Sequence, residues 1–126
     1  MKIIEHFIGG KEYSGSSKRL SSVYNPATGE ETAKVKLGSQ EDIDRAVEIA
    51  QEAFVTWSNT PPLQRARVLF KFKELIEKNE DELTKIIVSE HGKVYEDAKG
   101  SLTRGLEVVE YACGIPQMLK GEFTEM

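Results

Sequence analysis

The sequence predicts an α+β fold in which short strands over residues 1–38 precede three or four amphipathic helices over residues 39–116. Two observations support this prediction. Glycine and proline turn signals divide the first third into short β-prone runs, whereas apolar residues in the remainder recur with the 3.6-residue period of a helix. The 126 residues amount to one domain or to part of a larger one.

The N-terminal third is predicted to form short strands joined by tight turns. Residues 7–8 and 11–13 flank Gly9-Gly10, a pair that supplies the positive φ angles of a two-residue hairpin turn. Residues 25–29, Asn-Pro-Ala-Thr-Gly, predict a second turn. Residues 32–37 alternate between apolar and charged side chains, which favours a half-buried strand.

The clearest amphipathic helix is predicted after Gly38. Ser39 is a candidate N-cap, and Asp42, three residues later, completes the acidic variant of a capping box. Charged and amide side chains occupy the opposite face of this helix. The predicted apolar stripe consists of Ile43, Ala46, Val47, Ala50, Ala53, Phe54 and Trp57.

Further helices are predicted up to Pro116, which limits the last one. Pro61-Pro62 opens the second helix in its first turn, where proline is tolerated. Asn79 is a candidate N-cap for a continuation, and Gly92 fits a C-cap. The last helix runs from about Tyr95 to Cys113. Its predicted inner face consists of Ala98, Leu102, Leu106, Val109 and Cys113.

The apolar faces of these helices exceed what the few predicted strands can cover. A chain of this size buries only about two-thirds of its surface. Two alternatives follow: the helices pack on each other as a bundle, or they pack on additional sheet that residues 1–126 do not supply.

Composition excludes several classes of function. The net charge of −4 and the pI near 5.3 argue against a nucleic-acid partner, because no basic patch would release counterions. No apolar run approaches the ~20 residues of a membrane span, and the polar N-terminus is not that of a signal peptide. A single cysteine cannot form an internal disulfide. This fits a reducing compartment, the cytoplasm or, in a eukaryote, the mitochondrial matrix.

No complete catalytic constellation is present in the sequence. It contains neither a G-x-G-x-x-G motif nor a Walker loop. His6 and His91 lie far apart, without further ligands at metal-binding spacing, which argues against a zinc site. Cys113 falls on the predicted inner face of a helix, so we expect a small buried apolar residue rather than a nucleophile.

Arg104 is the strongest candidate for a binding residue. It lies between Gly100 and Gly105, and each glycine within a helix costs about 1 kcal/mol relative to alanine. Close approach of a ligand or of another backbone would explain that cost. Two interpretations remain open: a surface ion pair with Glu107, or a guanidinium presented over a glycine-cleared surface to bind a carboxylate in a bidentate manner.

Several motifs carry a resemblance to a known family. FIGGK at 7–11, VYNPATGE at 23–30, AFVTW at 53–57, RARVL at 65–69 and EHGK at 90–93 occur in the order seen in the N-terminal portion of aldehyde dehydrogenases. The segment GSLTRGLEVVEYACGIP at 100–116 resembles, more narrowly, the coenzyme-A-dependent methylmalonate-semialdehyde dehydrogenases. The resemblance covers nearly the whole chain and implies a partial aldehyde-dehydrogenase-like α/β fold.

That resemblance implies a function for the full-length protein in valine and inositol catabolism. Such enzymes oxidise malonate or methylmalonate semialdehyde with NAD through a cysteine thiolate and a thioester, lose carbon dioxide, and transfer the acyl group to coenzyme A. Arg104 matches the family arginine that holds the substrate carboxylate. The Val23 carbonyl and Glu90 align with a monovalent-cation site. Family members are usually dimers of dimers, so the full-length enzyme is expected to be a homotetramer.

The resemblance also implies what this chain lacks. The catalytic cysteine, the oxyanion-stabilising asparagine and the NAD contacts of the family lie in segments beyond Met126, and Cys113 does not match the catalytic position. Residues 1–126 are therefore expected to be the first, incomplete part of the cofactor-binding domain, inactive alone and without a cofactor. Two alternatives are a non-enzymatic helical interaction module and a segment of another aldehyde dehydrogenase that acts on a short acid aldehyde.

Overall fold

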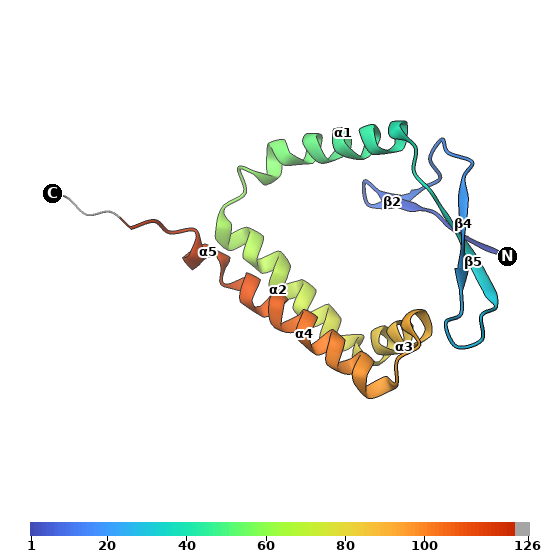
Figure 1. Ribbon diagram of the computed structural model, residues 1–126. Coiled ribbons are helices and arrows are strands. Elements are labelled where there is room, and N and C mark those ends of the chain that lie inside the picture. Colours follow the sequence, from blue (N-terminus) through green and yellow to red (C-terminus); the bar gives the residue numbers. More distant parts are fainter. Residues whose placement is uncertain (123–126) are drawn as a thin grey trace. The chain divides into compact units, whose positions relative to one another are not determined.

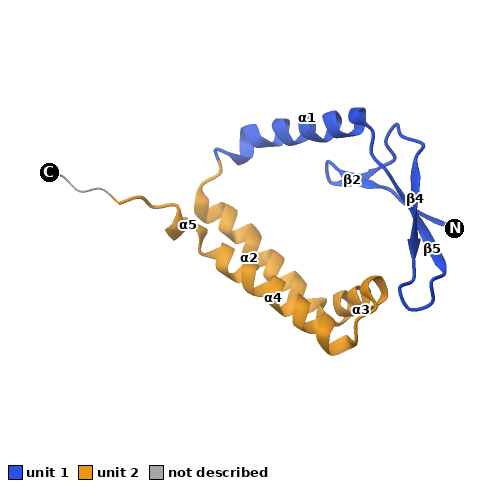
Figure 2. Cartoon of the chain, in the orientation of Figure 1, with its two compact units in different colours: residues 1–59 blue, residues 60–126 orange. Residues whose placement is uncertain are grey.

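The computed structural model describes residues 1–122 and divides the chain into two compact units, Met1–Asn59 and Thr60–Met126 (Figure 2). The α+β prediction is confirmed, because short strands occupy the first part of unit 1 and helices make up most of residues 40–118 (Figure 1).

Unit 1 contains two small sheets. In the first, β5 (Glu31–Lys36) lies between β1 (Lys2–Ile4), which runs parallel to it, and β4 (Leu20–Tyr24), which runs antiparallel. In the second, β2 (His6–Ile8) and β3 (Lys11–Tyr13) form an antiparallel hairpin. The predicted Gly9-Gly10 turn closes this hairpin with both φ angles positive, at 65° and 79°.

Strands β1 and β4 are absent from the sequence prediction. β1 is only three residues long, and β4 begins Leu-Ser-Ser, so neither shows the alternation of apolar and polar residues that marks a strand. Their pairing with β5 defines them instead. The strand predicted at 32–37 is confirmed with a shift of one residue, to 31–36.

Helix α1 (Gln40–Trp57) begins with the predicted capping box. The Ser39 hydroxyl accepts a hydrogen bond from the Asp42 backbone N–H at 3.2 Å, and the Asp42 carboxylate accepts one from the Ser39 N–H at 2.8 Å. These bonds satisfy two of the backbone donors that every helix N-terminus leaves unpaired.

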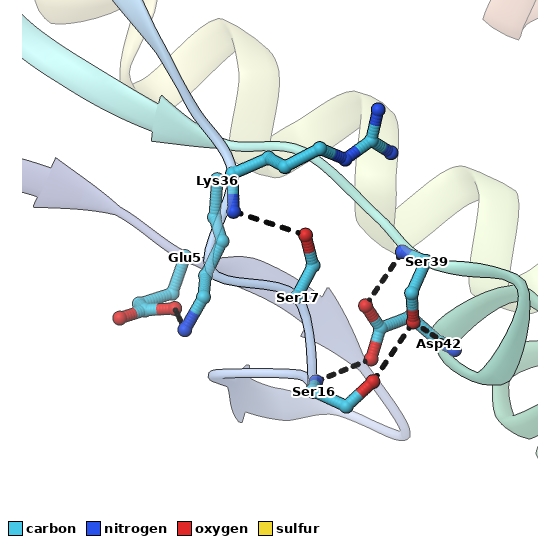
Figure 3. A network of polar contacts seen from close by, with 7 residues as sticks. Glu5, Ser16, Ser17, Lys36, Ser39 and Asp42 are labelled. Atoms are coloured by element: carbon cyan, nitrogen blue, oxygen red, sulfur yellow. Dashed lines mark hydrogen bonds and ion pairs between the residues drawn. The ribbon is translucent and has the colours of Figure 1, made fainter.

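Asp42 also ties α1 to the loop that follows β3 (Figure 3). Its second carboxylate oxygen accepts the Ser16 N–H at 2.8 Å, and the hydroxyls of Ser16 and Ser39 lie 2.9 Å apart. Asp42 is only 3% exposed. The backbone N–H of Ser39, followed by that of Ser16, stabilises the charged form and lowers the pKa of Asp42 from 3.8 to about 2.

A second polar contact in unit 1 is the ion pair between Glu5 and Lys36, the last residue of β5. Glu5 lies between β1 and β2, and its carboxylate is 3.7 Å from the Lys36 ammonium (Figure 3). Both side chains are largely shielded from solvent, with 25% and 17% of their surfaces exposed.

The apolar stripe of α1 does not face a core within the described residues. Ile43, Val47 and Phe54 are 55%, 61% and 58% exposed. Of the stripe residues only Ala46 is half-buried, and it lies on the better covered side of α1 together with buried Asp42 and half-buried Ile49. The amphipathic period therefore predicts the helix correctly but does not identify a face that this chain itself buries.

Unit 2 is helical. Its elements are α2 (Pro62–Lys78), α3 (Glu80–His91), α4 (Tyr95–Cys113) and the short α5 (Ile115–Met118). The prediction that proline opens the second helix is confirmed at Pro62, the first residue of α2. Pro116 does more than limit α4, because it lies within the first turn of α5.

Asn79 occupies the predicted N-cap position of α3, and its backbone carbonyl accepts the Leu83 N–H at 2.9 Å. Its side chain makes no capping bond to α3 but donates to the Leu75 carbonyl at 2.7 Å, so it closes the C-terminus of α2. An amide side chain can donate as well as accept a hydrogen bond. Here the Asn79 amide donates to a carbonyl in the last turn of α2, where helix carbonyls lack backbone partners. The predicted C-cap at Gly92 is confirmed, with φ at 74° and its N–H bonded to the Val88 carbonyl.

Helix α4 packs against both α2 and α3. Small residues lie at these contacts: Ala66 is 1% exposed and Ala98 is fully buried. Thr84, also fully buried, donates its hydroxyl to the Glu80 carbonyl at 2.7 Å. Ion pairs connect the same helices at the surface, between Lys73 and Glu110 and between Lys99 and Glu80, at 3.3 and 2.6 Å.

Large apolar side chains remain exposed throughout residues 1–122, and the buried apolar residues described there are small: Ala33, Ala66, Ala98 and Cys113. Exposed apolar patches of this extent usually mark surfaces that another protein segment covers. The sequence left two alternatives: helices that pack only on each other, or helices that pack on additional structure. The exposed apolar side chains favour the second. None of the described helices is long and apolar enough to cross a membrane.

Replacing Asp42 with Asn is expected to destabilise unit 1 at neutral pH, because an amide offers one acceptor oxygen where the carboxylate offers two. In the unsubstituted protein this stabilisation is complete above the unfolded pKa of 3.8. It is lost as the pH falls through the folded pKa of about 2. Urea unfolding at a series of pH values, followed by fluorescence of Trp57, the single tryptophan, measures both effects.

Ser17→Ala is the matched control, because the Ser17 hydroxyl accepts only the nearby Arg19 N–H and its removal leaves Asp42 its partners. A D42N protein that loses stability between pH 4 and pH 2 as steeply as the unsubstituted protein would contradict the assigned role of Asp42.

Candidate functional site

Helix α4 presents Arg104 on its outward face. The inner face predicted from the sequence is confirmed, because Ala98 and Cys113 are buried and Leu102, Leu106 and Val109 are half-buried. Successive residues of an α-helix are rotated by about 100°, so Arg104 points away from Leu102 and Leu106. Its side chain is exposed.

The ion pair with Glu107 that the sequence left open is not formed. Within residues 1–122, no carboxylate lies at ion-pair distance from the Arg104 guanidinium. One guanidinium nitrogen, Nη2, donates to the Ser101 hydroxyl at 3.3 Å. The remaining donors of Arg104 have no protein acceptor in the described part of the chain, so the fork can receive an external anion.

Ser101 is also bonded to a second cation, which the sequence did not single out. The Lys93 ammonium donates to the Ser101 hydroxyl at 2.8 Å, and this hydroxyl donates to the Asp97 carbonyl at 3.1 Å. One feature of the sequence could have pointed to Lys93: it follows Gly92, the predicted C-cap. A left-handed residue at that position turns the chain sharply from α3 into α4.

The two glycines beside Arg104 are not required by packing within the described chain. A Cβ at Gly100 would lie 3.6 Å from the guanidinium of Arg104, an ordinary contact, and a Cβ at Gly105 would meet nothing within 4 Å. Both φ angles are ordinary for a helix. The surface next to Arg104 is therefore open, and no packing contact within residues 1–122 requires its glycines.

The two residues predicted for a monovalent-cation site lie in different units. Val23 belongs to β4, at a register irregularity, and its carbonyl accepts the Thr32 hydroxyl at 3.2 Å. Glu90 is exposed near the end of α3. Among the described residues, no group of three or more His, Cys, Asp or Glu side chains is arranged to hold a metal ion. The cation site stays a prediction.

Cys113 is 8% exposed at the end of the inner face of α4. This burial agrees with the prediction of a small apolar residue and offers no access for a substrate. His6 and His91, the other groups considered for metal binding, belong to different units.

The chain as a whole defines a class of protein. The model of the aldehyde dehydrogenase family matches residues 13–126. The chain therefore belongs to the aldehyde dehydrogenase family.

Individual relatives and solved structures resemble the chain over nearly its whole length. The chain is 47% identical over 124 residues to malonate-semialdehyde dehydrogenase of Pseudomonas aeruginosa, and 45% identical over 119 residues to that of Halalkalibacterium halodurans. These alignments cover 98% and 94% of this chain but 25% and 24% of the relatives. The chain thus spans about a quarter of their length.

Two solved structures share the fold of this segment. A Sinorhizobium meliloti protein assigned as a methylmalonate-semialdehyde dehydrogenase, solved in complex with NAD, matches with a TM-score of 0.95 and 48% identity over 99% of this chain and 26% of its own. Methylmalonate-semialdehyde dehydrogenase of Oceanimonas doudoroffii matches with a TM-score of 0.93 and 51% identity. This match covers 97% of this chain and 25% of the other. The prediction of an aldehyde-dehydrogenase-like partial fold is confirmed.

Gly105→Ala is expected to stabilise unit 2 by about 0.5–1 kcal/mol, because alanine has the higher helix propensity. The added methyl group meets no atom of the described chain. Urea unfolding followed by circular dichroism measures the change.

Gly92→Ala is the opposing control and should destabilise the same unit, since the φ of 74° at Gly92 strains any residue with a Cβ. A loss of stability in G105A would show that the surface beside Arg104 is not open in this chain.

Proposed function

We propose that this chain is the N-terminal segment of an NAD-dependent, coenzyme-A-acylating malonate- or methylmalonate-semialdehyde dehydrogenase, and that it is inactive alone. The observation that carries the proposal is the exposed guanidinium of Arg104, free of any carboxylate among residues 1–122, in a chain 47% identical to a malonate-semialdehyde dehydrogenase. The activity requires the remaining three-quarters of the enzyme.

In this proposal, Arg104 binds the carboxylate at the far end of the semialdehyde. A guanidinium presents parallel N–H donors that match the two oxygens of a carboxylate, so a bidentate pair fixes orientation as well as charge. Holding the carboxylate leaves the aldehyde carbon at a set distance, where the catalytic thiolate of another segment can attack it. Arg104 thereby selects an acid aldehyde over an uncharged one.

The cofactors and the assembly belong to the complete enzyme. Residues 1–122 contain no glycine-rich phosphate-binding loop, so they do not fit an NAD or coenzyme A site by themselves. The exposed apolar faces of α1 and α2 are surfaces that the rest of the enzyme would cover. We also propose a homotetramer, located in the cytoplasm or, in a eukaryote, in the mitochondrial matrix.

The test is Arg104→Leu in the complete enzyme that carries this segment, assayed on malonate semialdehyde and on propanal, which lacks the carboxylate. Hydrogen bonds to charged groups contribute about 1.5–3 kcal/mol, so kcat/KM for malonate semialdehyde should fall about 10- to 100-fold while that for propanal is unchanged. Arg104→Lys should retain part of the activity, because the charge remains and the bidentate geometry is lost.

Arg45→Leu is the matched control, since Arg45 is also exposed on a helix but pairs with Glu48. It should affect neither substrate. Equal losses on both aldehydes in R104L would sink the proposed role. A selective loss with a preference for a longer acid aldehyde, such as succinate semialdehyde, would instead favour another member of the family.

A further inference from the structure

Two cationic side chains converge on one hydroxyl at the outward face of α4. The Lys93 ammonium and the Arg104 guanidinium donate to the same oxygen, Ser101 Oγ, at 2.8 and 3.3 Å. Like charges this close repel each other unless an anion accompanies them. Their shared partner is neutral, so it bridges the two cations without compensating their charge.

The hydroxyl of Ser101 is saturated by these contacts. A hydroxyl has one proton and two lone pairs. Its proton goes to the Asp97 carbonyl at 3.1 Å, and its lone pairs receive Lys93 and Arg104. Ser101 therefore cannot take a further ligand, but each cation keeps donors that it does not use on Ser101.

No carboxylate of residues 1–122 forms an ion pair with either cation. Other lysines of unit 2 behave differently. Lys73, Lys85 and Lys99 each lie at 2.5 or 2.6 Å from a carboxylate oxygen, and these contacts raise their pKa values. At Ser101, two positive charges share one hydroxyl, and no carboxylate of residues 1–122 forms an ion pair with either.

Lys93 is held in place rather than free in solvent. Gly92 ends α3 in the left-handed region, and Val94 follows as the N-cap of α4, so the chain reverses direction at Lys93. The reversal brings Lys93 to Ser101, eight residues later. Lys93 is half-buried, whereas Arg104 is exposed.

We propose that Lys93 is a second carboxylate-binding group, paired with Arg104, and that Ser101 is the positioning residue that sets their spacing. This inference rests on the proposed function, because it assigns a further residue to the same site. A carboxylate has two oxygens with about four acceptor sites, enough for the guanidinium fork and the ammonium together. The ligand class is a short aldehyde that carries one carboxylate.

The test is Lys93→Met in the complete enzyme, compared with R104L on malonate semialdehyde and propanal. KM for malonate semialdehyde should rise about tenfold with little change in kcat, and KM for propanal should stay the same, as expected when a charged hydrogen bond to the substrate is removed. The inhibition constant of malonate, used as a competitive probe, should rise by a similar factor. Lys93→Arg should preserve both values within about twofold.

Lys99→Met is the matched control, because Lys99 lies six residues after Lys93, in the second turn of α4, but forms an ion pair with Glu80. Its substrate preference should not change. If K93M does not fold, Ser101→Ala provides the second test: it removes the bridge, keeps both charges, and should raise KM for malonate semialdehyde but not for propanal.

The outcomes separate the two proposals. A selective effect in R104L without one in K93M and S101A would overturn the role of Lys93 and leave the proposed function intact. Equal effects of K93M on both aldehydes would assign Lys93 a structural role only and would also overturn the inference. Absence of selectivity in R104L as well would overturn the proposed function and the inference with it.

Discussion

The packing of α4 against α2 and α3 is the contact on which the candidate site depends. Small residues, Ala66 and Ala98, allow these helices to approach closely, and the ion pairs Lys73–Glu110 and Lys99–Glu80 flank the contact. Once the inner face of α4 is fixed, the helical period places Arg104 on the outside. The same packing fixes the start of α4, where Lys93 and Arg104 both donate to the Ser101 hydroxyl.

The second constraint is the small size of the buried core. Large apolar side chains stay exposed on α1 and α2, and the buried apolar positions within residues 1–122 are filled by alanine and cysteine. Hydrophobic burial is the main favourable term in folding, so these faces are expected to find partners in a complete enzyme. Because the chain spans about a quarter of its relatives, the activity that we propose depends on segments that also supply this cover.

Much of the local structure could be predicted from the sequence, because local signals determine it. The Gly9-Gly10 turn, the Ser39–Asp42 capping box and the Gly92 C-cap depend on residues close in the chain. Strands β1 and β4 could not be predicted, since pairing with β5 defines them. For Asn79, the type of residue predicted the N-cap position of α3 but not that its side chain would donate to the end of α2. Arg104 could be predicted as a binding residue from the glycines on either side of it. Its shared contact with Lys93 at Ser101 could not, because that contact forms only when the chain turns at Gly92.

The most direct test of carboxylate recognition by this segment is a crystal structure of the complete enzyme with bound malonate, a close analogue of malonate semialdehyde. If Arg104 selects the substrate, one malonate carboxylate will accept two hydrogen bonds from its guanidinium, at about 2.7–2.9 Å, with the other end directed toward the catalytic cysteine. Malonate bound in the catalytic pocket without contact to Arg104 would contradict the proposed site.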